Sequence, residues 1–89
     1  MRYPRISLIT AYRPSRIALG PVDVAAVRIR LKMRQREFAL RFAIPLTTLR
    51  HWEQEDRRPT GPALVLMHLI QDNPQAVLAA MQRIRFRRR

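Results

Sequence analysis

Cysteine is missing from this sequence, and its absence excludes several kinds of chemistry at once. Disulfide bonds, thiolate zinc sites, iron–sulfur clusters and cysteine nucleophiles all depend on that residue. The two histidines, His51 and His68, are not at the HxxxH spacing of helical metal ligands. The sequence also shows no nucleophile–base pair and no phosphate-binding glycine loop. We therefore predict that the protein is not an enzyme and has no metal, no other cofactor and no small-molecule substrate.

Long hydrophobic runs are absent as well, since none approaches the ~18 residues that a membrane-spanning helix requires. The apolar stretch from Ile6 to Ala11 is too short for the hydrophobic part of a signal peptide, and no cleavage site follows it. The sequence thus predicts no membrane partner and a cytoplasmic location.

Acidic residues are scarce: 6 of them face 18 basic residues, all arginine except Lys32, and the net charge is +12. Apolar residues make up 47% of the chain, too many for a disordered basic tail. The length of 89 residues fits one small domain. Such a domain buries only about 60–65% of its unfolded surface, which favours support from a partner subunit. We expect a folded basic domain whose partner is a nucleic acid.

The charge is unevenly distributed along the chain. Residues 1–20 carry +4, residues 21–52 carry +5, residues 53–82 carry −2 and residues 83–89 carry +5. A ribosomal-type protein coated uniformly with positive charge would lack this asymmetry. The distribution is typical of a domain with one face toward DNA.

Hydrophobic periodicity divides the chain into an arm, a helical domain and a tail. Residues 1–21 show no helical period and form a basic arm, with a possible short strand at 6–10. Residues 22–84 form the predicted domain, and 85–89 an arginine-rich tail. We expect five helices, over 22–32, 35–42, 45–54, about 61–72 and 74–84, and hence an all-α fold. Asp23, Thr60 and Asn73 are the expected N-caps, and Leu49 and Trp52 the inward side chains of the third helix.

The middle of the chain resembles a known family. Arg30-Leu31-x-x-x-Gln35-x-Glu37-Phe38-Ala39, then Ile44-Pro45-Leu46-x-Thr48-Leu49-Arg50-x-Trp52-Glu53-Gln54 and Arg57-Arg58-Pro59, are similar to the Cro/Xre-type phage-repressor family of helix-turn-helix proteins. Asn73 to Val77 resembles its short single-domain branch, which includes bacterial antitoxins of the HigA type. The resemblance covers residues 24–81. It implies a phage-repressor-like helix-turn-helix domain, encoded by a bacterium or a phage and associated with the nucleoid when bound.

The resemblance implies that residues 46–53 form a recognition helix in the major groove of double-stranded DNA. Its base-reading positions are Leu46, Thr47, Thr48, Arg50 and His51. In such domains the glutamine that opens the second helix, here Gln35, contacts a phosphate, and basic residues after the recognition helix do likewise. The expected phosphate contacts are Arg34, Gln35, Arg36, Arg57 and Arg58.

Three positions depart from the family pattern. Lys32 and Glu55 stand where the family usually has glycine, and Arg34 stands where it has a serine or threonine N-cap. Lys32 is therefore expected to take a poor C-cap geometry, or else the first helix ends differently. Arg34 cannot cap as serine does, and Glu55 affects the turn after the recognition helix. We expect these substitutions to alter local stability more than the fold.

The sequence is compatible with three functions. The leading one is a sequence-specific transcriptional regulator, a repressor that binds a palindromic operator as a homodimer. The alternative is an antitoxin that binds a toxin protein and autoregulates its operon, with the arm or the tail as the toxin contact. A non-specific RNA-binding or ribosome-associated protein is the third, but it leaves the string from Leu46 to Gln54 unexplained. A neighbouring reading frame for a small ribonuclease would favour the antitoxin.

Overall fold

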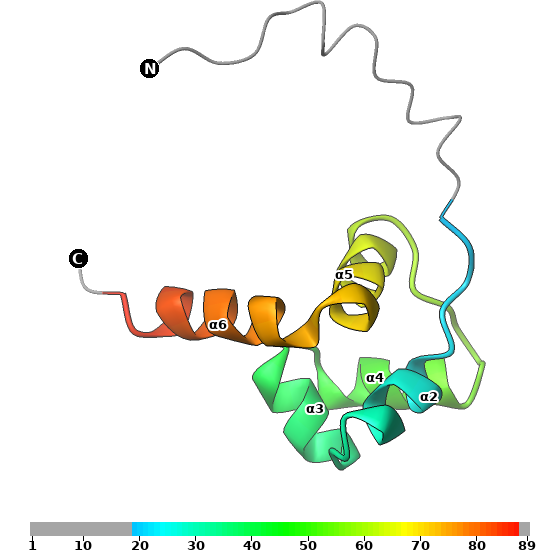
Figure 1. Cartoon of the computed structure of the whole chain (residues 1–89). Coiled ribbons are helices and arrows are strands. Elements are labelled where there is room, and N and C mark those ends of the chain that lie inside the picture. Colours follow the sequence, from blue (N-terminus) through cyan, green and yellow to red (C-terminus); the bar gives the residue numbers. More distant parts are fainter. Residues whose placement is uncertain (1–18, 88–89) are drawn as a thin grey trace, which may run out of the picture.

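The computed structural model describes residues 19–87, which fold as five α-helices without a strand in that range. The helices are α2 (Val24–Arg30), α3 (Gln35–Arg41), α4 (Leu46–Glu53), α5 (Pro62–Asp72) and α6 (Pro74–Arg85). The first three form a compact lower layer, α5 stands above them, and α6 leads away from its foot (Figure 1). The predicted all-α, five-helix fold is confirmed. The predicted arm and its possible strand at 6–10 lie almost entirely outside the described residues.

The core is formed where these helices meet. Phe38, Phe42, Leu49, Met67 and Ile70 are essentially inaccessible to solvent, and the rings of Phe38 and Phe42 lie 4.7 Å apart between centroids. Burial of each such side chain contributes roughly 1.5–3 kcal/mol relative to leaving it exposed. The core therefore fixes α3 and α4 against α5, and it leaves the opposite face of α4 toward solvent.

Two of the three expected N-caps are confirmed. The carboxylate of Asp23 accepts a hydrogen bond from the Ala26 amide at 3.0 Å, and the Asn73 side chain accepts one from the Ala76 amide at 3.1 Å. The expectation for Thr60 is wrong, because α5 begins one residue later, after Gly61. Gly61 has φ 57°, which glycine adopts without steric cost, and Pro62 supplies the fixed φ of the first turn. Arg34 precedes α3 without a side-chain cap, as expected.

Three successive helices end in the same way. A residue with positive φ follows α2, α3 and α4, and these residues are Lys32 (59°), Ala43 (57°) and Glu55 (63°). After each one, the next amide donates back to a carbonyl five residues earlier: Met33 to Arg28, Ile44 to Ala39 and Asp56 to His51. This is the Schellman motif, whose left-handed position favours glycine. The poor C-cap geometry predicted for Lys32 is thus present, and Ala43 is a third instance that the sequence pattern had not indicated.

Helices α5 and α6 are only partly covered by the rest of the domain. Helix α5 is apolar at most of its positions, yet Val65 is 45% and Leu69 54% exposed. No residue of α6 is buried, although Val77 and Leu78 pack against the edge of the core. The apolar surface of α5 and α6 that the monomer leaves uncovered is therefore substantial.

Candidate nucleic-acid interface

Helix α4 is the element on which the sequence placed base recognition, and its bounds coincide with the predicted 46–53. Leu49 is completely buried and anchors the helix, while α3 packs beside it. Thr47 and Arg50 lie on the opposite side and are exposed. The helix is thus held from one side by the core and offers polar side chains on the other.

The other predicted base-reading side chains are partly buried or contact a neighbouring side chain. Leu46 is partly buried and packs against the core, and Thr48 is half-buried. The imidazole Nδ1 of His51 lies 3.2 Å from a carboxylate oxygen of Asp56, in the loop after α4. This contact holds the ring toward the loop and leaves the outer face of α4 chiefly to Thr47 and Arg50.

A carboxylate at the end of α4 ties the first three helices together. Glu53 accepts two hydrogen bonds from the Arg28 guanidinium, one from Nε to Oε2 at 2.6 Å and one from Nη2 to Oε1 at 2.8 Å. The Nε2 amide of Gln35 donates to the same Oε1 at 3.0 Å. The third guanidinium nitrogen of Arg28 donates to the Met33 carbonyl at 2.9 Å. The contacts of Glu53 therefore fix the end of α4 against α2 and the start of α3.

Both charges of this pair are largely shielded, with the Arg28 and Glu53 side chains 16% and 7% exposed. Burial alone would raise the pKa of the Glu53 carboxyl. Hydrogen bonds from Arg28 and Gln35, together with the positive charge of Arg28, outweigh that effect and hold the pKa below its usual range. The same contact raises the pKa of Arg28. Glu53 therefore stays ionised and forms an ion pair with Arg28 at the end of α4.

The fold of this domain has a counterpart among solved structures. A helix-turn-helix XRE-family-like protein from Agrobacterium tumefaciens is 39% identical to this chain, and the two structures superpose with a TM-score of 0.65. The match covers 70% of this chain and 98% of the other. The chain belongs to the XRE-type helix-turn-helix family. No protein-family model and no curated protein matches it by sequence.

Membership of the XRE-type family identifies which helices form the helix-turn-helix. Helices α3 and α4 and the Schellman turn between them form the helix-turn-helix, and the fold is that of a DNA-binding regulator, a fold that is typically non-enzymatic. Within the described part of the chain, no helix is long and apolar enough to cross a membrane.

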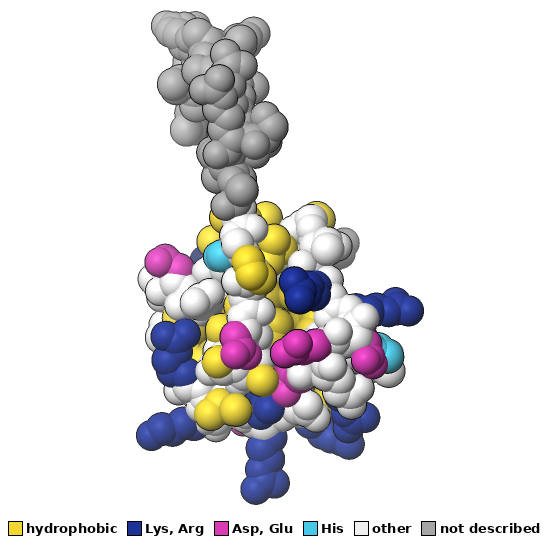
Figure 2. Space-filling view, turned by 90° about the vertical axis from the view of Figure 1, so that its right-hand side faces the viewer, with side chains coloured by type: hydrophobic (Ala, Val, Ile, Leu, Met, Phe, Trp, Pro, Cys, Tyr) yellow, Lys and Arg dark blue, Asp and Glu magenta, His cyan; other side chains and the backbone are white. Residues whose placement is uncertain are grey.

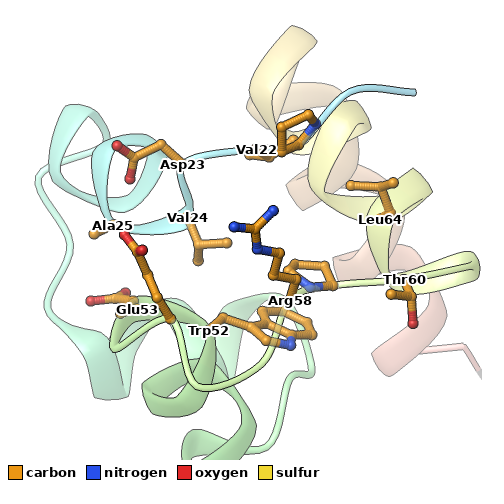
Figure 3. Close-up of a pocket in the computed structure, with 12 residues that line it drawn as sticks. Val22, Asp23, Val24, Ala25, Trp52, Glu53, Arg58, Thr60 and Leu64 are labelled. Carbon is orange, nitrogen blue, oxygen red and sulfur yellow. The ribbon is translucent and has the colours of Figure 1, made fainter. Parts of the chain in front are cut away.

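The predicted phosphate contacts fall into two groups around this XRE domain. Arg34, Arg36 and Arg57 are exposed near the ends of α3 and α4. One N–H of the Gln35 side-chain amide donates to Glu53, and its second N–H is available to donate to a phosphate. Arg58 lies elsewhere, because its side chain lines a pocket beside Trp52 (Figure 3).

Arg28 is a residue to which sequence reasoning gave no role, although the structure makes it the partner of Glu53. The spacing of Arg28 from the apolar residues of α2 nevertheless indicates a partly buried position. Arg28 lies one helical turn after Val24, which is buried, so that both belong to the same face of α2. An arginine at the edge of a buried stripe requires a partner of opposite charge, and Glu53 is that partner.

Proposed function

We propose that this protein is a sequence-specific transcriptional regulator, a repressor that inserts α4 into the major groove of its operator. The proposal rests on the observation that α4 is fixed against the rest of the domain at one face and exposed at the other. Leu49 and the ion pair of Glu53 with Arg28 fix the helix, while Thr47 and Arg50 project from it without a partner among the described side chains. A polar helix face that is held rigidly and left open suits direct readout of base edges.

In this proposal the residues divide into base readers and phosphate contacts, and residues 22–84 form the DNA-binding domain between the arm and the tail. Arg50 pairs with guanine and Thr47 contacts a neighbouring base edge. His51 and the half-buried Thr48 and Leu46 supply the closer contacts along α4. Basic side chains at the two helix ends hold the backbone. The phosphate contacts in this scheme are Arg34, Gln35, Arg36 and Arg57, and Arg58 joins them when its side chain turns out of the pocket beside Trp52.

The decisive experiment is selection of bound sequences from a pool of random DNA duplexes. We expect enrichment of a palindrome whose half-sites lie about one helical turn apart, because a symmetric dimer places two copies of α4 on one side of the DNA. Equal affinity for all duplexes at moderate salt would contradict sequence-specific binding. Binding to structured RNA as tight as to the selected duplex would instead support the non-specific RNA-binding class.

Replacement of Arg50 with alanine is expected to weaken binding to the selected operator by about 1–3 kcal/mol and to relax preference at one base pair of each half-site. The reason is that Arg50 projects from α4 where a guanine edge would lie. Fluorescence anisotropy against operators with single base changes measures both effects. The matched control is Arg83→Ala, which removes the same charge from the exposed surface of α6. This control must leave base preference unchanged, and a change of preference there would contradict the assignment to α4.

A homodimer is part of this proposal, and the uncovered faces of α5 and α6 support it. Leu69 on α5 and, near the end of α6, Ile84 and Phe86 are 54–76% exposed. An isolated helix of 12 residues is marginal in water, and α6 has no buried residue to hold it. A second copy of the chain packed on these faces would cover the apolar surface and stabilise α6.

We expect Ile84→Glu to convert the dimer into a monomer, because it places a charge in the apolar contact between two copies of α6. Sedimentation equilibrium gives the oligomeric state. Ile29→Glu is the matched control, since Ile29 is 63% exposed against 60% for Ile84 but lies on α2. Dissociation by the Ile29 variant, or a dimer that survives Ile84→Glu, would place the interface elsewhere.

The antitoxin alternative stays a prediction of the family resemblance and is compatible with repression of its own operon. Its test is genetic: the neighbouring reading frame should code for a small ribonuclease, and that product should bind this protein when the two are expressed together. An isolated gene would contradict it.

A further inference from the structure

A pocket of about 530 Å³ opens between the start of α2, the end of α4 and the chain that leads into α5. Its apolar walls include Val22, Leu64 and the indole of Trp52 (Figure 3). Trp52 was expected to be a core residue, and it does pack against the core, but only half-buried and with part of its surface in this pocket. None of the proposed base-reading residues lines it. The pocket is therefore separate from the proposed base-reading face of α4, and it shares one residue, Arg58, with the proposed phosphate contacts.

Three carboxylates and one guanidinium, that of Arg58, line the pocket, so acidic side chains outnumber basic ones there in a protein of charge +12. Asp23 and Glu55 stand on its wall, both are exposed, and neither forms an ion pair within the described residues. The Glu53 carboxylate also contributes to the wall but is neutralised by Arg28. Viewed from this side, the molecule shows acidic side chains gathered below an exposed hydrophobic area with a basic side chain beside it (Figure 2). The combination of apolar walls, an indole and two unpaired carboxylates suits a ligand that is both cationic and apolar.

We propose that this pocket binds the N-terminal segment 1–18 of the same chain, with an arginine of that segment between Trp52 and the carboxylates of Asp23 and Glu55. The segment carries arginines and no acid, and its other side chains include Leu8, Tyr12 and Ile17. Charge and apolar character thus match the pocket at the same time. The arginines are Arg2, Arg5, Arg13 and Arg16.

The position of the segment in the chain also favours it. The imidazole Nε2 of His68 lies 2.7 Å from the Gly20 carbonyl and fastens the chain to α5, and the next two residues, Pro21 and Val22, line the pocket. The segment is therefore joined to the rim of the pocket. A short tether supplies an effective concentration of order mM, so that even a weak contact is occupied. The arginine-rich C-terminus is the poorer match, because α6 leads away from this side and none of its residues lines the pocket (Figure 1).

The chemistry of the contact follows from the side chains present. A guanidinium lies favourably over the face of an indole, and two carboxylates beside it satisfy its charge. The side chain of Arg58 already stands in the pocket between Val22 and Trp52 (Figure 3), which shows that a guanidinium fits there. An arginine from the segment would take that place and turn Arg58 outward.

Trp52 is the only tryptophan, so its fluorescence reports on the pocket in the full chain. In an Arg58→Gln background, in which Arg58 cannot cover the indole again, we expect replacement of the four arginines of segment 1–18 by glutamine to increase quenching of Trp52 by acrylamide roughly twofold, because the indole face then becomes accessible. Asp23→Asn with Glu55→Gln should have the same effect, and asparagine retains the N-cap of α2. Circular dichroism verifies that each variant is folded. The matched control is Glu37→Gln with Asp72→Asn, which removes two acidic charges outside the pocket and should leave quenching unchanged.

Four outcomes would overturn the proposal. Quenching unchanged by loss of the segment's arginines would mean that it does not occupy the pocket. If quenching rose as much in the control variant as in the pocket variant, the cause would be the change in net charge and not the loss of a contact in the pocket. A rise only after replacement of Arg87, Arg88 and Arg89 would identify the C-terminus as the occupant. Quenching that grows on dilution would assign the segment to a second copy. The measurement contains no DNA, so failure of the proposed regulatory function would not affect it.

Discussion

Replacement of Glu53 with alanine should lower the free energy of unfolding by about 3–5 kcal/mol, because it leaves the shielded guanidinium of Arg28 without its counter-charge. A small domain has only about 5–15 kcal/mol of stability in total, so this loss brings it close to unfolding. Urea denaturation at neutral pH, followed by circular dichroism, measures the change. The loss follows from an unpaired charge and not from lost helix propensity, since alanine is a good helix former.

Two controls separate the ion pair from other effects of the substitution. Arg28→Met with Glu53→Met should restore most of the stability, because it removes both charges and keeps apolar volume. The pH dependence gives the second control. The folded-state pKa of Glu53 lies below its unfolded value, so the stabilisation is complete above the unfolded pKa and is lost as the pH falls through the folded one. The alanine variant should show a flatter acid limb, and an unchanged limb would contradict the role of Glu53.

Glycine at the three Schellman positions should stabilise the protein by about 1 kcal/mol at each position, after allowance for the greater freedom of glycine in the unfolded chain. The variant is Lys32→Gly with Ala43→Gly and Glu55→Gly, where φ is 57–63° in each case. For a domain of this size, each kcal/mol raises Tm by roughly 4–8 °C. Thermal unfolding of the single and triple variants tests the effect and its additivity.

Ala79→Gly is the matched control for these glycine substitutions. Ala79 is exposed within α6, where the backbone is helical, and glycine should there destabilise by about 1 kcal/mol. If the three turn variants were also destabilised, the positive φ values at those positions would be contradicted.

The sequence predicted those parts of the fold that depend on near neighbours. Asp23 and Asn73 each cap an amide three residues later, and Leu49 follows from the period of α4 itself. The pattern predicted this helix over 45–54, one residue longer at each end than the observed Leu46–Glu53, and the bounds 46–53 came from the family resemblance. Helix α5 was misjudged at its start because Thr60 and Gly61 are both acceptable caps, and only the backbone conformation decides between them.

Features that depend on distant parts of the chain were not predictable in the same way. Arg28 and Glu53 are 25 residues apart, and local periodicity carries no information about such a pairing. The exposure of Leu69 depends on where α6 leaves the fold, which composition alone does not determine. The pocket beside Trp52 needs three separate segments to be in place. For the proposed base readers, the sequence pattern predicted which face of α4 carries them. It did not predict that His51 contacts Asp56 while the Arg50 side chain is exposed and has no partner among the described side chains.

The contacts of Glu53 with two helices and of Arg28 with the turn between them determine how the domain opens. Disruption of the carboxylate contact frees the start of α3, the end of α4 and, through Arg28, the end of α2 together. We therefore expect these three helices to open as a single cooperative unit. Helix α6 has no buried residue, and it contacts the rest of the domain through the packing of Val77 and Leu78 and a hydrogen bond from Arg85 to the Leu40 carbonyl. We expect its exposed end to open more readily than the helix-turn-helix, so that the surface proposed for subunit contact adapts while the helix-turn-helix stays intact.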